Sequence, residues 1–420
     1  MGATRGLQQI AIGLLHRHPV MSASRWAMWA GLATILLVSA EFAARWWLGF
    51  RSVYYVWPPG LRLRVYPDPD VFPELERVVR FEVNSDGERG DEIPRKGNLY
   101  RILVAGGSAP EGYLLGQATN WPGALQRLLN RPEALSALRA AKVHVGNICR
   151  SNIGSQALSL VLERVLPRYR RLDVIIVMVG MSDVFRWLEM GTPPFLPPSI
   201  PASDVFVCHP EGPFGWTPRA MALLQLLRRG QRRYLRPLKT VRRAASWMGH
   251  ARARRAGARE IRAATPDPAP MLDHFECHFR RSLQLAKAHA DWVLVARQPY
   301  LAKDSYTNEE QSHFYHGGIG KAYRPQKDAD VFYSVEVTAQ LMALIDSRAV
   351  LVADELGIEH LDLMPRLDRS LKHFCDFAHF TPAGAAAVAE AVATTILQHV
   401  ARRSIATPSS AQGGRDEDRH

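Results

Sequence analysis

The sequence predicts an α/β protein, a three-layer α/β/α sandwich around a mostly parallel five-stranded sheet, preceded by one N-terminal transmembrane helix. Three observations support this fold class. Short apolar runs alternate with longer helical patterns, small or polar residues follow the first three apolar runs, and a long apolar stretch lies near the N-terminus. Strands that alternate with helices form parallel sheets covered on both faces.

The chain divides into five predicted parts. The lead-in to the main domain is rich in Pro, Tyr and Trp and is expected to pack on that domain, whereas the C-terminal tail lacks apolar periodicity and is expected to be disordered. The parts are a basic N-terminal segment (1–25), a membrane segment (26–48), the lead-in (49–100), the main domain (101–403) with a basic helical insert (217–264), and the tail (404–420).

The membrane segment is apolar on every face. Residues 26–44 carry one charge, Glu41, and a transmembrane helix needs about 20 residues. Tryptophans near both ends suit membrane interfaces. Val38-Ser-Ala40 also fits a signal-peptidase site, but we favour an uncleaved anchor. Arginines flank the segment on both sides, so the positive-inside rule does not decide its orientation.

The main domain contains five strand-like runs separated by helical patterns. The predicted strands cover 101–105, 142–147, 173–179, 291–296 and 358–363. The predicted helices cover 120–130, 155–170, 271–290, 333–356 and 382–402.

A serine follows the first predicted strand. Arg101-Ile-Leu-Val-Ala-Gly-Gly-Ser108 is an apolar run that ends in a glycine turn, and open α/β folds place functional side chains at this edge of the sheet. Near the other end of the chain, Asp376-Phe-Ala-His379 precedes Thr381-Pro382, an N-cap and first-turn pair that marks a helix start. Serine, histidine and aspartate are the parts of an acyl-transfer triad.

The order of the remaining blocks resembles the SGNH, or GDSL-like, hydrolase family over about residues 81–400. The blocks are Lys142-Val-His-Val-Gly-Asn147 leading into Ile148-Cys-Arg-Ser-Asn152, and a later strand that ends in Gly180-Met-Ser-Asp183. The upstream run Phe81-Glu-Val-Asn-Ser-Asp-Gly-Glu-Arg-Gly90 is similar to the lead-in of the membrane-associated bacterial branch. This resemblance implies a flavodoxin-like sandwich and a serine hydrolase.

The resemblance also implies a role for each site residue. Ser108 would be the nucleophile, His379 the base, and Asp376 the carboxylate that orients the imidazole. The backbone N–H of Ser108 would contribute to the oxyanion hole. The family's Gly-x-Asn-Asp is altered here, so Ser182 replaces an amide donor. The second-block glycine falls on Asn152 by spacing, with Gly154 as the alternative.

The function implied by the resemblance is that of a membrane-anchored serine esterase or O-acyltransferase acting on O-acyl esters. The expected substrate is an O-acylated small molecule or glycan of the cell envelope or of exported polysaccharide, and no cofactor is expected. The expected location is the bacterial inner membrane, with a single span and a periplasmic catalytic domain. The altered oxyanion positions leave open an alternative, a catalytically degraded subunit that binds glycan or scaffolds an export or biosynthesis complex.

A basic insert dominates the charge of the chain. Residues 219–262 contain 14 Arg or Lys residues and one acidic residue, an excess equal to the formal net charge of +13. Three interpretations remain open: a solvated helical excursion, docking on anionic lipid head groups, and steering of an anionic substrate. Nucleic acid is not an expected partner, because the segment has few aromatics and no known motif. The cysteine and histidine spacings predict no metal site.

Overall fold

The computed structural model describes residues 22–47, 54–94, 97–207, 209, 221–224, 226–227, 238–320 and 330–406. Most of the predicted basic N-terminal segment and tail, and most of the first half of the basic insert, lie outside the described residues.

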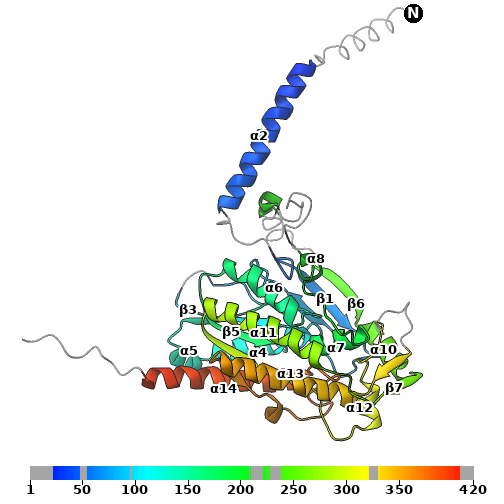
Figure 1. Cartoon of the computed structure of the whole chain (residues 1–420). Coiled ribbons are helices and arrows are strands. Elements are labelled where there is room, and N and C mark those ends of the chain that lie inside the picture. Colours follow the sequence, from blue (N-terminus) through cyan, green and yellow to red (C-terminus); the bar gives the residue numbers. More distant parts are fainter. Residues whose placement is uncertain are drawn as a thin grey trace, which may run out of the picture.

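The central sheet has five parallel strands in the order β10-β8-β5-β3-β4 (Figure 1). This confirms the predicted fold class. The strands are β3 (Leu99–Gly106), β4 (Lys142–Asn147), β5 (Leu172–Met178), β8 (Ala290–Ala296) and β10 (Glu359–Leu361). The middle strand β5 is an almost continuous apolar run that is buried along nearly its whole length, as expected for a strand with neighbours on both sides and helices on both faces.

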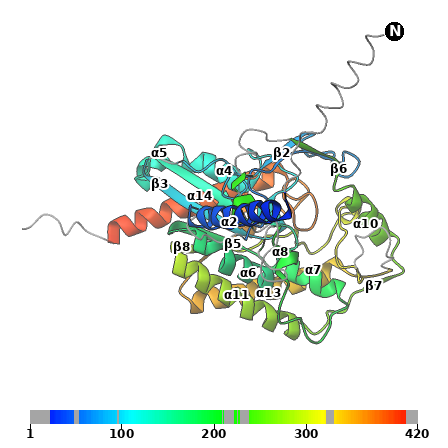
Figure 2. The same ribbon diagram turned by 90° about the horizontal axis from the view of Figure 1, so that it is seen from above.

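Helices cover both faces of this sheet (Figure 2). One layer contains α4 (Trp121–Leu129), α5 (Pro132–Leu138) and α14 (Pro382–Ala406). The other layer contains α6 (Ser155–Val165), α7 (Met181–Glu189), α11 (Ala269–His289) and α13 (Val335–Glu355). The predicted helix over 155–170 is shorter than expected, because its last turn continues as the 3₁₀ helix η1 (Leu166–Arg168).

Side-chain caps fix the starts of three of these helices. Asn120 Oδ1 accepts a hydrogen bond from Gly123 N (3.0 Å) at α4, and Ser334 Oγ accepts one from Val337 N (3.3 Å) at α13. Thr381 Oγ1 accepts one from Gly384 N (3.2 Å), which confirms the helix start predicted at Thr381-Pro382.

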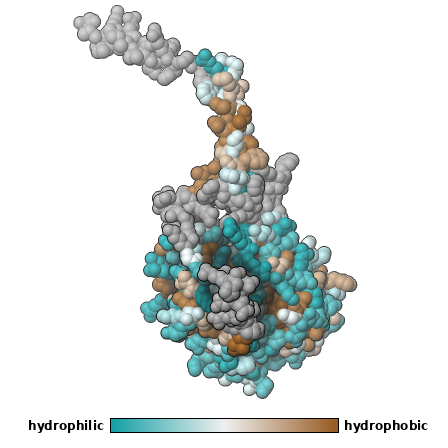
Figure 3. Space-filling view, turned by 90° about the vertical axis from the view of Figure 1, so that its left-hand side faces the viewer, coloured by the Kyte–Doolittle hydropathy of each residue, from teal (hydrophilic) through white to brown (hydrophobic). Residues whose placement is uncertain are grey.

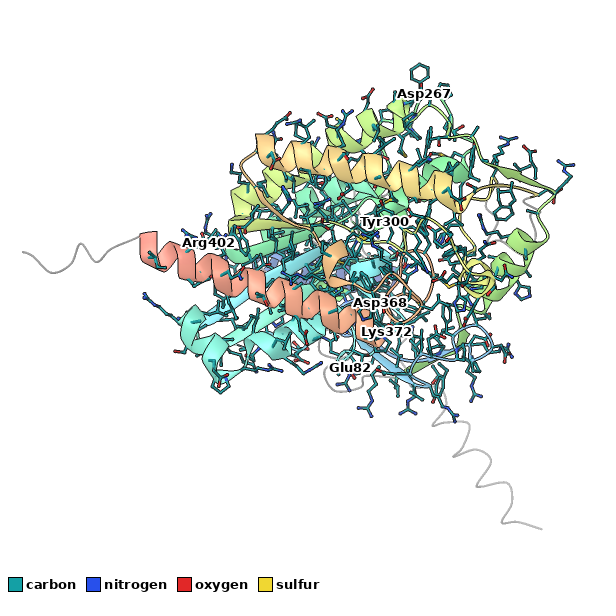
Figure 4. All side chains as sticks on the ribbon, turned by 90° about the horizontal axis from the view of Figure 1, so that it is seen from below. Glu82, Asp267, Tyr300, Asp368, Lys372 and Arg402 are labelled. Atoms are coloured by element: carbon teal, nitrogen blue, oxygen red, sulfur yellow. The ribbon has the colours of Figure 1, made fainter. Side chains whose placement is uncertain are left out.

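Contacts near both ends hold α14 in place. Figure 4 shows Lys372 beside the start of α14 and Arg402 toward its other end. Thr381 Oγ1 donates to the carbonyl oxygen of Lys372 (2.6 Å) at the start of the helix. Arg402 donates to Glu359 of β10 (2.7 Å) near its end.

A second sheet, which the sequence did not predict, joins the lead-in to the basic insert. Its order is β2-β1-β6, where β1 (Arg62–Pro67) is antiparallel to β2 (Val79–Glu82) and parallel to β6 (Lys239–Ala244). The predicted helical character of the insert is therefore wrong at β6, and again at β7 (Glu260–Arg262), which pairs with β9 (Val331–Tyr333). Both segments form strands because they pair with segments that are distant in the sequence. The insert does contain a described helix, α10 (Ser246–Ala256).

The N-terminal helix α2 (Ala23–Trp47) projects from the body of the molecule, and hydrophobic side chains gather along it (Figures 1 and 3). By length and composition, Ala23–Trp46 could cross a membrane, and this is the one such helix among the described residues. Glu41 is 3% exposed. Its carboxylate accepts hydrogen bonds from Arg45 (2.8 Å) and from the backbone N–H groups of Ala222 and Leu223 (both 2.9 Å), so helix α2 contacts the start of the basic insert.

Candidate active site

A tight turn after β3 presents Ser108 at the carboxyl edge of the sheet. β3 ends at Gly106, and Ser108 begins the short helix α3 (Ser108–Glu111). A Cβ atom at Gly106 would lie 1.9 Å from the carbonyl oxygen of Met178 in β5. A Cβ at Gly107 would lie 3.1 Å from a carbonyl oxygen of the loop after β4. Because the turn packs directly against these carbonyl oxygens, Gly106 leaves no room for a side chain, and Gly107 leaves little room for one.

The loop before α14 carries Asp376 and His379. His379 Nε2 lies 2.8 Å from Ser108 Oγ. His379 Nδ1 lies 2.8 Å from Asp376 Oδ2 and 3.0 Å from Oδ1. The backbone N–H groups of Ala378 and His379 also donate to Asp376 Oδ1, at 2.8 and 2.9 Å. The structure thus places the three predicted triad side chains in one hydrogen-bonded row.

The electrostatics of this row favour a charged aspartate and a basic histidine. Burial opposes the charge of Asp376, but the His379 imidazole and the Ala378 N–H outweigh it and hold the pKa of Asp376 below its usual value. Burial also lowers the pKa of His379, but the Asp376 carboxylate outweighs burial and raises that pKa above its usual value. When His379 is neutral, its Nδ1–H donates to Asp376 and its Nε2 accepts the Ser108 hydroxyl proton. A hydroxyl in contact with an oriented base is an activated nucleophile.

The predicted oxyanion residues lie on the nucleophile turn and on the segments that follow β4 and β5. No hydrogen bond among the described residues engages the backbone N–H of Ser108. Ser182 Oγ lies 3.5 Å from where a Cβ of Gly107 would be, and Gly154 lines a pocket together with Ser182. Asn152 has an exposed side chain and a left-handed φ of 66°. The structure thus places Gly154 and Ser182 at one pocket, and it gives Asn152 a backbone conformation that glycine adopts readily.

Asp183 joins the two helix starts that carry these candidates. Its carboxylate accepts hydrogen bonds from Ser155 N (2.9 and 3.0 Å) and Ser155 Oγ (2.6 Å). Burial raises the pKa of Asp183 to about 6, although the Ser155 hydrogen bonds act in the opposite direction. The sequence placed Asp183 in a motif, but its contact with the start of α6 becomes visible only in the structure.

Arg89 binds the segment at the end of the short helix that follows the nucleophile turn, a role that the sequence did not reveal. It is 1% exposed and donates to the carbonyl oxygens of Glu111, Gly112 (2.8 Å) and Leu115 (2.5 Å). Burial lowers the pKa of Arg89 to about 10, so the guanidinium remains charged at neutral pH. Because Glu111 ends the helix that Ser108 begins, Arg89 fixes the far end of that helix.

The neighbouring Glu88 attaches the lead-in to β4. Its buried carboxylate accepts hydrogen bonds from His144 (2.7 Å), Tyr169 (2.8 Å) and Asn84 (3.0 Å). Burial alone would raise the pKa of Glu88, but His144, Tyr169 and the charge of Arg101 together lower it to about 2. The lead-in is thus held in the core by a charged group with satisfied hydrogen bonds.

A second imidazole lies next to the triad. The His316 ring stacks on Phe185 of α7, with centroids 3.7 Å apart and planes 12° apart, and its centroid lies 6.3 Å from that of His379. Burial lowers the pKa of His316 to about 3, so its ring is neutral at physiological pH. The loop that carries His316 therefore reaches the triad.

A pocket opens beside Ser182 between α6, α7 and α11. Its lining includes Gly154, Ser182, Arg186, Met271 and His274. Apolar and cationic side chains both line it. Within the described residues, no group of three or more His, Cys, Asp or Glu side chains could hold a metal ion, and the cysteines at 149, 277 and 375 are free thiols.

Comparisons with known proteins gave only distant structural similarity. No family model matches the sequence, and no curated protein matches it. An acetylxylan esterase, Axe2 from Geobacillus stearothermophilus, is 12% identical with a TM-score of 0.36, over 72% of this chain and 94% of that one. A lipolytic protein of the G-D-S-L family from Veillonella parvula is 10% identical with a TM-score of 0.36, over 70% and 96% of the two chains. The enzyme LAE5, from the metagenome of Lake Arreo, is 12% identical with a TM-score of 0.35, over 71% and 96%. Similarity at this level does not assign the chain to a family.

Proposed function

We propose that this protein is a serine esterase or O-acyltransferase of the SGNH type that acts on O-acyl esters. The observation that carries the proposal is the continuous row from Ser108 Oγ through the His379 imidazole to the Asp376 carboxylate, with a contact of 2.8 Å on each side of the ring. A nucleophile, a base and a group that orients the base are the geometric signature of nucleophilic acyl transfer.

The proposed reaction has two halves. Ser108 Oγ attacks the ester carbonyl carbon while His379 Nε2 takes the hydroxyl proton, and Asp376 stabilises the resulting imidazolium. The C–O bond to the leaving alcohol then breaks, and His379 gives its proton to that alcohol. The acyl group, now on Ser108, passes to water in an esterase or to a sugar hydroxyl in a transferase, with His379 again acting as base. No redox step or cofactor is required.

The oxyanion of the tetrahedral intermediate would be held by backbone N–H groups. Ser108 N–H is one donor, and Gly154 N–H is the second that we propose, since Gly154 precedes α6 and lines a pocket together with Ser182. The hydroxyl of Ser182 would contribute the third contact. Because Ser182 is shorter than an amide side chain, we expect this hole to be weaker than one with three well-placed donors. One lost donor can reduce turnover by about 10²–10³.

The setting of the site suggests the substrate class. With α2 in a bilayer, the domain would be held at the membrane surface, where O-acylated glycans of the cell envelope or of exported polysaccharide are made and modified. We therefore propose a single-pass protein of the bacterial inner membrane with its catalytic domain in the periplasm. A periplasmic reporter fused after residue 406 should be active, and activity of a cytoplasmic reporter instead would contradict the envelope substrate.

Covalent labelling by a fluorophosphonate probe tests the proposed activity. Wild type should be labelled, Ser108→Ala should not, and His379→Ala should react far more slowly. Ser182→Asn should react faster than wild type because it restores an amide donor. If wild type stays unlabelled while Ser182→Asn reacts, the altered hole has abolished catalysis. In that case the chain would serve as a subunit that binds glycan or scaffolds an export or biosynthesis complex.

A further inference from the structure

The basic insert accounts for the net charge of the chain, and its helix α10 lies beside the acid–base loop. Two arginines of this helix, Arg252 and Arg255, are each only partly exposed. Both donate hydrogen bonds to backbone carbonyl oxygens of segments that surround the triad. A basic side chain that serves only for solubility is expected to extend into solvent instead.

Arg252 connects the lead-in to the loop that carries Asp376. Its Nη1 donates to the carbonyl oxygen of Val71 (2.7 Å), and its Nη2 donates to that of Cys375 (3.2 Å). The guanidinium also lies over the ring of Phe72, 4.9 Å from the centroid. Cys375 immediately precedes Asp376, so Arg252 holds the peptide from which the carboxylate projects.

Arg255 holds the second segment beside the triad. Its Nη1 donates to the carbonyl oxygens of His316 and Tyr333, the latter at 3.0 Å. Burial lowers the pKa of Arg255 to about 10, so it remains charged at neutral pH. The His316 ring stacks against Phe185 and faces His379, which makes Arg255 a support for the wall of the site.

The loop over 373–381 depends on few other backbone contacts to the rest of the fold. Leu301 N donates to Phe377 O (2.9 Å), and His313 Nδ1 lies 3.1 Å from Cys375 O. Most of its remaining bonds are internal, such as Cys375 N to His379 O (2.9 Å). A planar guanidinium donates in two directions at once, which an ammonium group does less well. Arg252 therefore provides a rigid link that orients the loop as a unit.

We infer that Arg252 and Arg255 are positioning residues and that helix α10 of the basic insert holds the Asp376–His379 loop in register with Ser108. The inference rests on the proposed function for its kinetic consequence, but the geometry that it explains is independent of the substrate. In this role Arg252 and Arg255 act within the protein rather than in binding a lipid or polysaccharide surface.

The first test measures the hydrogen bond between His379 and Asp376 directly and does not depend on enzyme activity. The sample is the full-length protein in detergent. The proton on His379 Nδ1, which is hydrogen-bonded to Asp376, should give a downfield NMR resonance that is protected from exchange with water. Asp376→Asn removes this resonance and so assigns it. We expect Arg252→Ala to broaden the resonance or accelerate its exchange, and Arg252→Lys to preserve part of the protection. The matched control is Arg242→Ala, which removes the same charge from an exposed position on β6.

If Arg252→Ala retains the same protected resonance as Arg242→Ala, the positioning role is refuted. Thermal unfolding of each variant shows whether it folds. Should Arg252→Ala fail to fold, Arg252→Lys and Arg255→Ala decide the question, because an unchanged resonance and unchanged kinetics in both would equally refute the role. This readout works whether or not the protein hydrolyses esters.

The second test is kinetic and separates positioning from substrate binding. Turnover of a short-chain aryl ester is measured per active site, counted by stoichiometric phosphonate labelling. Arg252→Ala should lower kcat by up to about 10²-fold, the scale of a misplacement of roughly 1 Å, and leave KM near its wild-type value. A raised KM with unchanged kcat would overturn the inference. If wild type shows neither labelling nor hydrolysis, the proposed function is contradicted. The NMR result would still decide whether Arg252 and Arg255 position the loop.

Discussion

Replacing Asp376 with Asn tests the proton arrangement of the site, because two backbone groups dictate how the new amide must sit. The N–H groups of Ala378 and His379 both donate to Asp376 Oδ1, at 2.8 and 2.9 Å. Only an oxygen can occupy that position. The amide nitrogen of Asn would therefore replace Oδ2, which lies 2.8 Å from His379 Nδ1.

That geometry forces the wrong tautomer on His379. An amide N–H facing Nδ1 requires Nδ1 to accept, so the ring proton moves to Nε2. Nε2 can then only donate to Ser108 Oγ and cannot take its proton. The volume and shape of the side chain are otherwise preserved, so the fold should remain intact. We expect kcat to fall by about 10⁴, the scale seen when a triad aspartate is converted to asparagine.

The assay is turnover of a short-chain aryl ester per folded molecule, with thermal unfolding measured in parallel. The control is Asp368→Asn, which makes the same chemical change at an exposed carboxylate near the start of α14 (Figure 4). Turnover in Asp376→Asn above a tenth of the wild-type value would refute the reasoning, since it would mean that His379 does not need this tautomer.

Three further predictions follow from the pKa shifts and the turn geometry. First, kcat/KM should fall with decreasing pH with a midpoint above 6.5, because the pKa of His379 is raised and the protonated ring cannot act as a base; a midpoint below 6.5 in a pH–rate profile would contradict this. Second, ionised Glu88 stabilises the fold fully above pH 4.5, and this contribution is lost as pH falls toward its folded pKa of about 2. The difference in urea midpoint between wild type and Glu88→Gln should therefore shrink over that range, and a difference that is constant with pH would be inconsistent with a charged Glu88. Third, Gly106→Ala should lower the melting temperature much more than Gly107→Ala, since the new Cβ would lie 1.9 Å rather than 3.1 Å from a carbonyl oxygen; equal losses would show that the turn relaxes.

The central sheet could be predicted from sequence because its strands are local patterns. β5 is an almost uninterrupted apolar run, and β3 ends in a glycine turn that needs close contact with β5. The triad followed from motif order, and helix α14 from its Thr-Pro start. In each case the residues that define the feature are neighbours in the chain.

The features that could not be predicted depend on contacts between distant segments. β6 has mostly exposed residues, half of them charged, and becomes a strand because it pairs with β1, about 176 positions upstream. Arg252 belongs to a run of arginines that looks solvated, yet its two Nη atoms donate to carbonyl oxygens from two other parts of the fold. Backbone carbonyls carry no sequence signature, so no local pattern could reveal this role. The choice between Asn152 and Gly154 likewise required the position of Ser182.

The chain between helix α2 and the body of the molecule is short. Helix α2 ends at Trp47, and described structure resumes at Tyr54. Seven residue steps span at most about 25 Å even when fully extended. With α2 in a bilayer, the start of the body would therefore lie within about 25 Å of the end of the helix, and Glu41 of the helix also accepts hydrogen bonds from Ala222 and Leu223. Under the proposed function, acyl groups close to the lipid surface would be within reach of the site, whereas those far out on a long polymer would not.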